Sequence, residues 1–131
     1  MSKDNYMEVI STDGRKKRSK DTSELIIDTA FSLLNEGILN ITHELIAKEA
    51  KIGTRTIFRH FKDKNSLIIG MHDKLLKDFE LSKPKIDLDI DVITRLKSLI
   101  EFTCNTYEKY QYVHHWTVKN LWYSKDVRMN I

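Results

Sequence analysis

The fold is decided by residues 41–67, which read ITHELIAKEAKIGTRTIFRHFKDKNSL. This stretch predicts two short helices joined by a tight turn, with a third helix beginning behind them. The second helix is predicted over residues 54–61, because its apolar residues recur at the spacing of one buried helical stripe. Those residues are Ile57, Phe58 and Phe61. Gly53 interrupts the pattern just before this helix, and no proline intervenes.

The remaining face of the 54–61 helix is polar and basic. It carries Thr54, Arg55, Thr56, Arg59 and His60. An apolar back fixes such a helix to its neighbour, while an Arg/Thr/His front can meet base edges and phosphates in the major groove of DNA. The preceding helix has a natural start at Thr42, whose side-chain oxygen can accept an unpaired backbone N–H group. The stretch therefore predicts a helix-turn-helix that reads DNA.

The same stretch resembles the N-terminal DNA-binding domain of the tetracycline-repressor (TetR) family. The family pattern is T-x-x-x-I-A-x-x-A-G-V-S-x-x-T-[LIV]-[YF]-x-[HY]-F-x-x-K-x-x-L. The residues that fall on it in register are Thr42, Ile46, Ala47, Ala50, Ile52, Thr56, Ile57, Phe58, His60, Phe61, Lys64 and Leu67. The density of matches makes the resemblance specific, and it covers roughly residues 20–80.

Three residues depart from the family pattern. The glycine of the turn is replaced by Lys51, which must either tolerate a positive φ or change the turn. The serine that usually begins the second helix is replaced by Gly53, which is a weaker cap. Phe58 stands where the family usually has tyrosine, so a hydroxyl contact to phosphate is lost and only packing remains.

The resemblance implies a set of DNA-binding residues that spans both short helices and the start of the third. The set is Thr42, His43, Thr54, Arg55, Thr56, Phe58, Arg59, His60 and Lys64. Arg55 is the residue that we expect on a base edge, because its guanidinium suits guanine O6 and N7. Thr42 and His43 are expected beside the DNA backbone, and His60 and Lys64 match phosphate contacts of the family. Arg59 faces either phosphate or solvent.

Composition indicates an all-α protein. The chain has 131 residues, 40% of them hydrophobic and 31% charged, with four glycines and one proline. Scarcity of both helix breakers, together with helical periodicity, favours helices throughout. The net charge of +3 is too small to argue for nucleic acid by itself. No apolar run is long enough to span a membrane, and no signal peptide is indicated.

Three parts are predicted along the chain. Residues 1–20 are expected to form a flexible basic arm, residues 21–81 the helix-turn-helix domain with its linker helix, and residues 82–131 a partial or reduced helical effector and dimerisation part. The basic run Arg15–Lys20 either lies along DNA phosphates, enters the minor groove, or is a solvated tail.

Helices outside the central stretch are placed by their apolar spacing and their breakers. Asp63 is expected to cap the linker helix. The segment Ser82–Asp91 holds the single proline and predicts a linker rather than a strand. The expected helices run from Thr22 or Ser23 to Asn35, from Asp63 to about Leu81, from Val92 to Tyr110, and over residues 112–123. The buried side of the Val92–Tyr110 helix is expected to carry Val92, Leu96, Leu99, Ile100, Thr103 and Tyr107.

The sequence indicates neither an enzyme nor a metal site, and no cofactor is expected. The histidines His114 and His115 are adjacent, so they face different ways on a helix and cannot chelate one metal ion together. Cys104, the single cysteine, lacks a nucleophile signature and is expected to be a small core residue. With one cysteine no internal disulfide is possible, which favours a reducing cytoplasm.

Four aromatic residues in the last part are candidates for a ligand pocket: Phe102, Tyr107, Trp116 and Trp122. They form either an ordinary core and subunit surface or the wall of an apolar pocket between helices. By resemblance to the TetR family, a small-molecule inducer would bind there and favour a conformer that no longer fits DNA.

We therefore expect a cytoplasmic DNA-binding transcriptional regulator, most simply a ligand-released repressor that binds double-stranded DNA as a homodimer. Its recognition helices would lie about 34–36 Å apart on a palindromic operator. The alternative is a helical ligand-binding or protein-interaction module that has lost DNA binding. The departures at Lys51, Gly53 and Phe58 favour that alternative.

Overall fold

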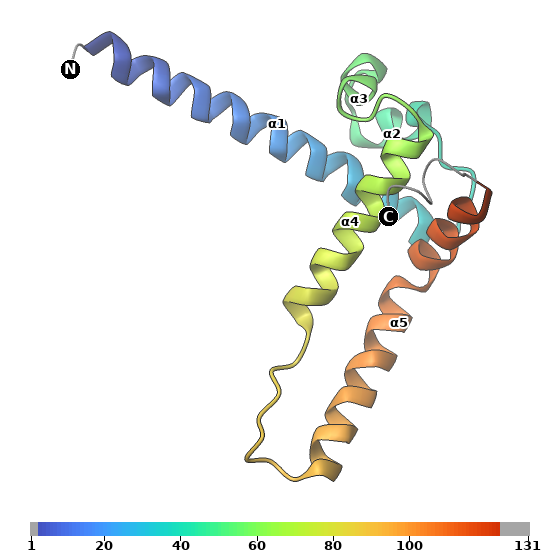
Figure 1. Ribbon diagram of the computed structural model, residues 1–131. Helices are drawn as coiled ribbons and strands as arrows, with labels where there is room; N and C mark the ends of the chain where they lie inside the picture. Colours follow the sequence, from blue (N-terminus) through green and yellow to red (C-terminus); the bar gives the residue numbers. More distant parts are fainter. Residues whose placement is uncertain (1–2, 124–131) are drawn as a thin grey trace.

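The computed structural model describes the backbone of residues 3–123 and the side chains of residues 14–121. Within that part the chain is all-α, as predicted, with five helices and no strand (Figure 1). The helices are α1 (Lys3–Asn35), α2 (His43–Ala50), α3 (Thr54–His60), α4 (Lys64–Ser82) and α5 (Val92–Tyr123).

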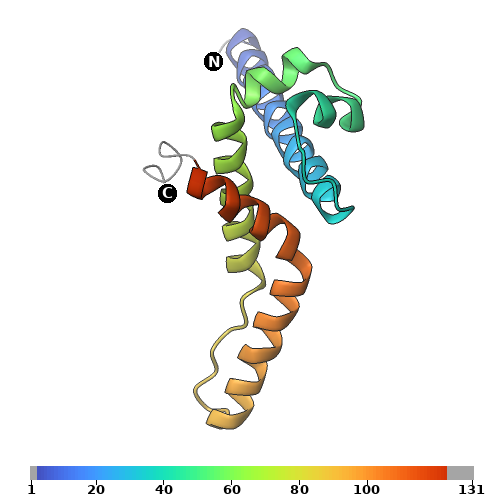
Figure 2. The same ribbon diagram turned by 90° about the vertical axis from the view of Figure 1, so that its right-hand side faces the viewer.

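The described residues form a head and a stem. The head contains the second half of α1, the short helices α2 and α3, and the beginning of α4; the stem is an antiparallel pair made by the rest of α4 and the first part of α5 (Figures 1 and 2). The end of α5 bends back to the head and contributes to its core. The buried apolar side chains of this one core are Ile26, Ile27, Ala30, Phe31, Leu33, Leu34, Ile41, Ile46, Ala47, Ile57, Leu67, Ile68, Met71, Val113 and Trp116.

The first helix is much longer than expected. We expected it to begin at Thr22 or Ser23 after a disordered arm, and that expectation is wrong, because α1 is continuous from Lys3. Residues 3–20 lack proline, have Gly14 as their only glycine, and are rich in good helix formers. Once residues 22–35 are fixed by packing, adding turns to the existing helix needs no new nucleation.

The turn between α2 and α3 is closed by backbone hydrogen bonds around Lys51. Lys51 adopts the left-handed conformation, with φ 56° and ψ 43°. The Ile52 N–H donates to the Ala47 carbonyl at 3.1 Å, which closes the end of α2. Thr42 caps α2 as predicted, accepting a hydrogen bond from the Leu45 N–H at 3.1 Å. Gly53 precedes α3 without any side-chain cap, also as predicted.

The start of α4 is fixed by Asp63, as predicted. Its carboxylate accepts a hydrogen bond from the Ser66 N–H at 2.8 Å, and the Asp63 N–H donates to the Ser66 hydroxyl at 3.2 Å. This reciprocal pair is a capping box. The helix ends at Ser82, and residues 83–91 contain neither helix nor strand, so the predicted linker around Pro84 is confirmed.

The last part contains one helix where we expected two. Nothing between Val92 and Tyr123 is glycine or proline, so no residue stops the helix. Near its end Val113 and Thr117 are buried, and the indole N–H of Trp116 donates to the Leu39 carbonyl at 3.1 Å. The end of α5 therefore belongs to the core of the head.

The first half of α5 is not buried as expected. The side chains of Leu96, Ile100 and Tyr107 are 51%, 54% and 64% exposed, and Cys104 is exposed rather than in the core. Only α4 and the linker lie alongside this half of α5 among the described residues (Figure 2). Two partners leave most of the circumference of a helix open, so its apolar stripe faces outward.

Candidate nucleic-acid interface

The short helix α3 is held on one side and open on the other. Ile57 is completely buried beneath it, whereas Thr54, Arg55 and Arg59 are exposed. Arg55 and Arg59 are four residues apart and therefore lie one above the other on the same face. Within the described side chains the single ion pair joins Lys74 to Asp78, so neither arginine is neutralised by a carboxylate. This face can donate several hydrogen bonds to an anion or a base edge.

Three other predicted residues lie at the cap of α2, in α3 and at the start of α4: Thr42, Thr56 and Lys64. Thr42 is exposed, although its hydroxyl oxygen already caps α2. Thr56 is half-buried between α3 and α1. Lys64 is exposed at the first residue of α4, where backbone N–H groups also point outward and suit a phosphate oxygen. Lys64 shares a hollow with Lys119 of α5, a neighbour that sequence spacing gave no reason to expect.

His43 is placed differently from our expectation. Its side chain is only 7% exposed, and its Nε2 lies 2.8 Å from the Phe61 carbonyl oxygen. Because a carbonyl can only accept, Nε2 carries the proton and donates. The ring also stacks on Phe58, with centroids 4.5 Å apart and planes 7° from parallel. The side chain of His43 therefore braces α2 against α3 and does not face outward to a DNA backbone.

Phe58 and His60 flank the exposed arginines. Phe58 is 42% exposed and its ring stacks on that of His43, so the ring packs as predicted while part of the side chain remains exposed. His60 is half-buried, and its Nδ1 lies 2.9 Å from the Ser23 hydroxyl oxygen. That hydrogen bond ties the end of α3 directly to α1.

Comparison with known proteins agrees with this geometry. Residues 26–71, which contain the buried half of α1, both short helices and the start of α4, match the model of bacterial regulatory proteins of the tetR family. The chain carries a TetR-family DNA-binding domain. The family is one of regulatory proteins, in accordance with the prediction that this chain is not an enzyme.

Curated relatives of this TetR-family domain are HTH-type transcriptional regulators of Staphylococcus aureus, among them those of strains USA300, NCTC 8325 / PS 47 and COL. Each is 34% identical over 94 residues, which cover 63% of this chain and 51% of the relative. The chain thus spans about half the length of the curated relatives that it matches. No solved structure matches the chain. None of the described helices is long and apolar enough to cross a membrane.

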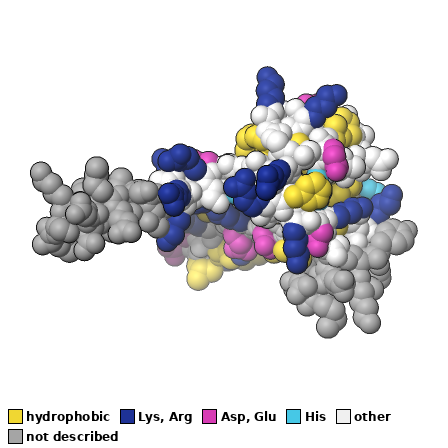
Figure 3. Space-filling view, turned by 90° about the horizontal axis from the view of Figure 1, so that it is seen from above, with side chains coloured by type: hydrophobic (Ala, Val, Ile, Leu, Met, Phe, Trp, Pro, Cys, Tyr) yellow, Lys and Arg dark blue, Asp and Glu magenta, His cyan; other side chains and the backbone are white. Residues whose placement is uncertain are grey.

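Basic side chains from α1 and the head gather on the face that Figure 3 shows. Figure 3 shows Lys and Arg side chains gathered along α1 and continuing over the part of the head that α2 and α3 form. Arg15 and Arg18 of α1 line a cleft together with Arg59 of α3. We considered the basic run as a mobile arm, so its place beside α3 was missed. The sequence did contain a signal. If the helix that holds Ile26 is continued backwards, Arg15, Arg18 and Thr22 fall on one face at spacings of three and four residues.

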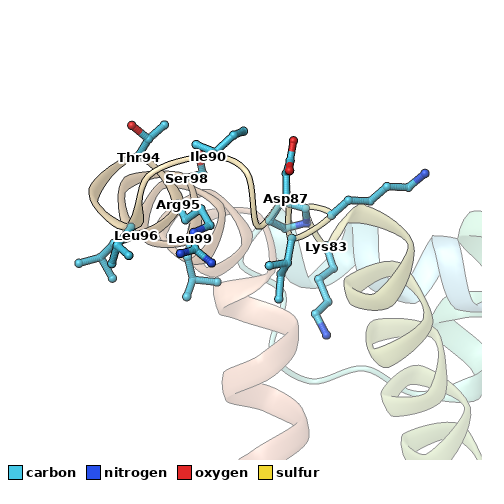
Figure 4. A pocket seen from close by; sticks show the side chains of 12 residues that line it. Lys83, Asp87, Ile90, Thr94, Arg95, Leu96, Ser98 and Leu99 are labelled. Atoms are coloured by element: carbon cyan, nitrogen blue, oxygen red, sulfur yellow. The ribbon is translucent and has the colours of Figure 1, made fainter.

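The aromatic residues proposed for a ligand pocket do not share one place. Phe102 lies against Phe79 of α4, with ring centroids 5.3 Å apart, and Tyr107 is mostly exposed. Trp116 is buried in the head, and the side chain of Trp122 lies outside the described residues. An apolar hollow of about 390 Å³ lies elsewhere, between the linker and the first turns of α5, where Ile90, Leu96 and Leu99 line it (Figure 4).

Proposed function

We propose that this chain is a sequence-specific DNA-binding transcriptional regulator that reads double-stranded DNA with α3. The observation that carries the proposal is the two-sided character of α3. Ile57 is completely buried and pins the helix, while Arg55 and Arg59 point outward without a carboxylate partner among the described residues. A helix fixed by its back and free at its guanidinium face suits the major groove, where arginine pairs with guanine.

We also infer that the regulator binds a palindromic operator as a homodimer. The support is a seven-residue apolar spacing on the exposed side of α5, at Ile93, Ile100 and Tyr107, with Leu96 between. Apolar residues at such spacing form the seam between paired helices. A row of exposed apolar side chains is a typical mark of an interaction surface.

We further propose that the protein is a repressor released by a small molecule. The hollow beside the linker is a suitable place for an apolar ligand, because Ile90, Leu96 and Leu99 line it. Arg95 also lines it, and its Nε is buried without a hydrogen-bond partner in the described structure, which favours a ligand with an acceptor group. Helix α4 runs from this end of the stem to the junction with α3, so a tilt of the stem would move the reading head.

Selection of binding sites from a random pool of duplexes tests the main proposal. The wild-type chain and Arg55→Ala are selected in parallel at about 100–150 mM salt, where non-specific binding is weak. We expect the wild type to enrich one palindromic sequence. Arg55→Ala should relax the preference at one position of each half-site and cost about 1–3 kcal/mol of binding free energy.

The matched control is Lys97→Ala, which removes one positive charge from an exposed position in the stem, far from α3. It should select the same sequence as the wild type. Uniform weakening of Arg55→Ala on all sequences would make Arg55 a phosphate contact. A single enriched half-site would contradict the homodimer, and no enrichment by the wild type would favour the alternative, a helical binding module without DNA affinity.

A further inference from the structure

We propose that residues 15–22 of α1 are part of the DNA interface. In this inference, which rests on the proposed function, a cleft between α1 and α3 holds one phosphate of the DNA backbone beside the bases that α3 reads. Arginines from both helices bind that phosphate together. Helix α1 therefore contributes to the affinity for DNA but not to the preference for a sequence.

The cleft is built by two helices that meet at an angle. It has a volume of about 410 Å³. From α1 it is lined by Arg15, Arg18, Ser19 and Thr22. From α3 it is lined by Thr56, Arg59 and His60. Three guanidinium groups and several hydroxyls thus surround one hollow, and no carboxylate is among the residues that line it.

This chemistry fits a phosphate better than any other common ligand. Guanidinium groups form paired, charge-assisted hydrogen bonds with phosphate oxygens, and hydroxyls add single ones. None of the three arginines is engaged in an ion pair within the described side chains, where the only such pair is Lys74–Asp78. Their charge is therefore available to an incoming anion.

The cleft is rigid on the side of the head. The hydrogen bond between Ser23 and His60, 2.9 Å long, joins the two helices at the inner end of the cleft. One turn further along α1, Ile26 and Ile27 are buried in the core. Arg15 lies eight residues before Ser23, or about 12 Å along the helix axis at 1.5 Å per residue. The backbone that carries the arginines of α1 is therefore fixed relative to the head, which reduces the conformational entropy lost on binding.

The opposite face of α1 provides the contrast. Successive residues are turned by about 100° in an α-helix, so Lys17 and Lys20 lie on the side away from Arg15 and Arg18. Both lysines are exposed, and neither lines the cleft. The face that bears them also carries the acidic residues Asp21 and Glu24, whereas the face toward α3 has only arginines and hydroxyls between Arg15 and Thr22. This difference between the two faces suits a helix that turns its positive face, free of carboxylates, toward a phosphate.

The test compares two double variants by the salt dependence of binding to a mixed-sequence duplex of about 30 base pairs. One variant is Arg15→Ala with Arg18→Ala; its matched control is Lys17→Ala with Lys20→Ala, which removes the same charge from the same helix. One lost phosphate contact lowers the slope of log K against log salt by about one unit. Between 50 and 200 mM salt, the fold-loss of affinity of the arginine variant should then be about 3.5 times smaller than the fold-loss of the wild type. The lysine pair should keep the wild-type slope.

A third variant asks whether the two helices share one phosphate. Arg59→Ala alone should also lower the slope by about one unit. The triple variant of Arg15, Arg18 and Arg59 should lower it by about one unit rather than two, because residues that share a partner are not additive. Thermal unfolding by circular dichroism should show each variant folded, since alanine is the best helix former.

Each result decides the matter. If the arginine and lysine pairs have equal slopes, or if the triple variant loses two units, the shared phosphate site is wrong while DNA binding itself stands. If the wild-type chain binds no duplex at all, the proposed function fails, and the phosphate site fails with it.

Discussion

Lys51 stands in the turn between α2 and α3, at the position where the family pattern has glycine. Its backbone is left-handed, with φ 56° and ψ 43°, although it has a full side chain. Such a conformation costs a non-glycine residue about 1–2 kcal/mol. Its N–H donates to carbonyls at the end of α2, and the Ile52 N–H donates to the Ala47 carbonyl, so hydrogen bonds close the turn despite the strain.

Lys51→Gly should therefore stabilise the chain. We expect the free energy of unfolding to rise by about 0.5–1 kcal/mol, because the relief of strain exceeds the extra freedom that glycine gives the unfolded chain. Urea unfolding followed by circular dichroism measures the change. Lys51→Ala is the control, since it removes the side chain but keeps the strain, and should give no such gain. Equal gains from both variants would show that the side chain, and not the backbone, is unfavourable.

At the scale of elements, the well-predicted helices are those with clear ends. Thr42 and Asp63 are capping residues that mark the starts of α2 and α4, and Pro84 indicates the linker. The apolar spacing of residues 54–61 placed α3 within one residue of its observed end at His60. These features are local, because a cap or a breaker acts within one turn of itself.

Helix ends that no capping residue or helix breaker marks could not be placed from the sequence. The continuity of α1 from Lys3 was missed, and so was that of α5, which passes through Gln111 without a breaker. In the candidate site, the outward set on α3 followed from its spacing. The inward turn of His43 did not, because the Phe61 carbonyl that it binds lies 18 positions further along the chain.

The cap of α4 makes a prediction about pH. The Ser66 N–H donates to the carboxylate of Asp63 and so lowers the pKa of that carboxyl below its ordinary value of 3.8. Because the folded-state pKa is the lower one, the stabilisation is complete above the unfolded value and is lost as the pH falls through the folded value.

Asp63→Asn isolates that effect, since asparagine caps a helix well but carries no charge. At pH 7 the wild type should melt at a higher temperature than Asp63→Asn, and the difference should shrink steadily below about pH 4. Asp63→Ala should melt lower than both at neutral pH, because it loses the cap itself. A difference between wild type and Asp63→Asn that stays constant down to about pH 2 would contradict the assigned cause.

For the whole molecule, the stem and the head have different surfaces. The head buries a continuous core, whereas the stem exposes the apolar row of Ile93, Ile100 and Tyr107. The sequence marked these side chains as apolar at helical spacing but could not tell what covers them. Periodicity identifies a face, while the partner of that face depends on the tertiary arrangement.

If the row on α5 joins two copies, changing it should separate them. Ile93→Lys combined with Ile100→Lys places charges in the seam and should convert a dimer into a monomer in sedimentation equilibrium. These two residues do not line the hollow at the linker, so ligand binding there should survive. Asn105→Lys, an exposed change on another side of the same helix, is the control and should leave the dimer intact. A wild-type chain that is monomeric at all concentrations would rule out the seam.

The hydrogen bond from Trp116 to Leu39 spans 77 positions of sequence. The family match ends at residue 71, yet the core of the head includes Val113 and Trp116. On a ribosome, which delivers the chain from its N-terminus, α1 to α4 are made before Val113 and Trp116. The full core of the head therefore needs residues that are synthesised late, well beyond the segment that the motif outlines.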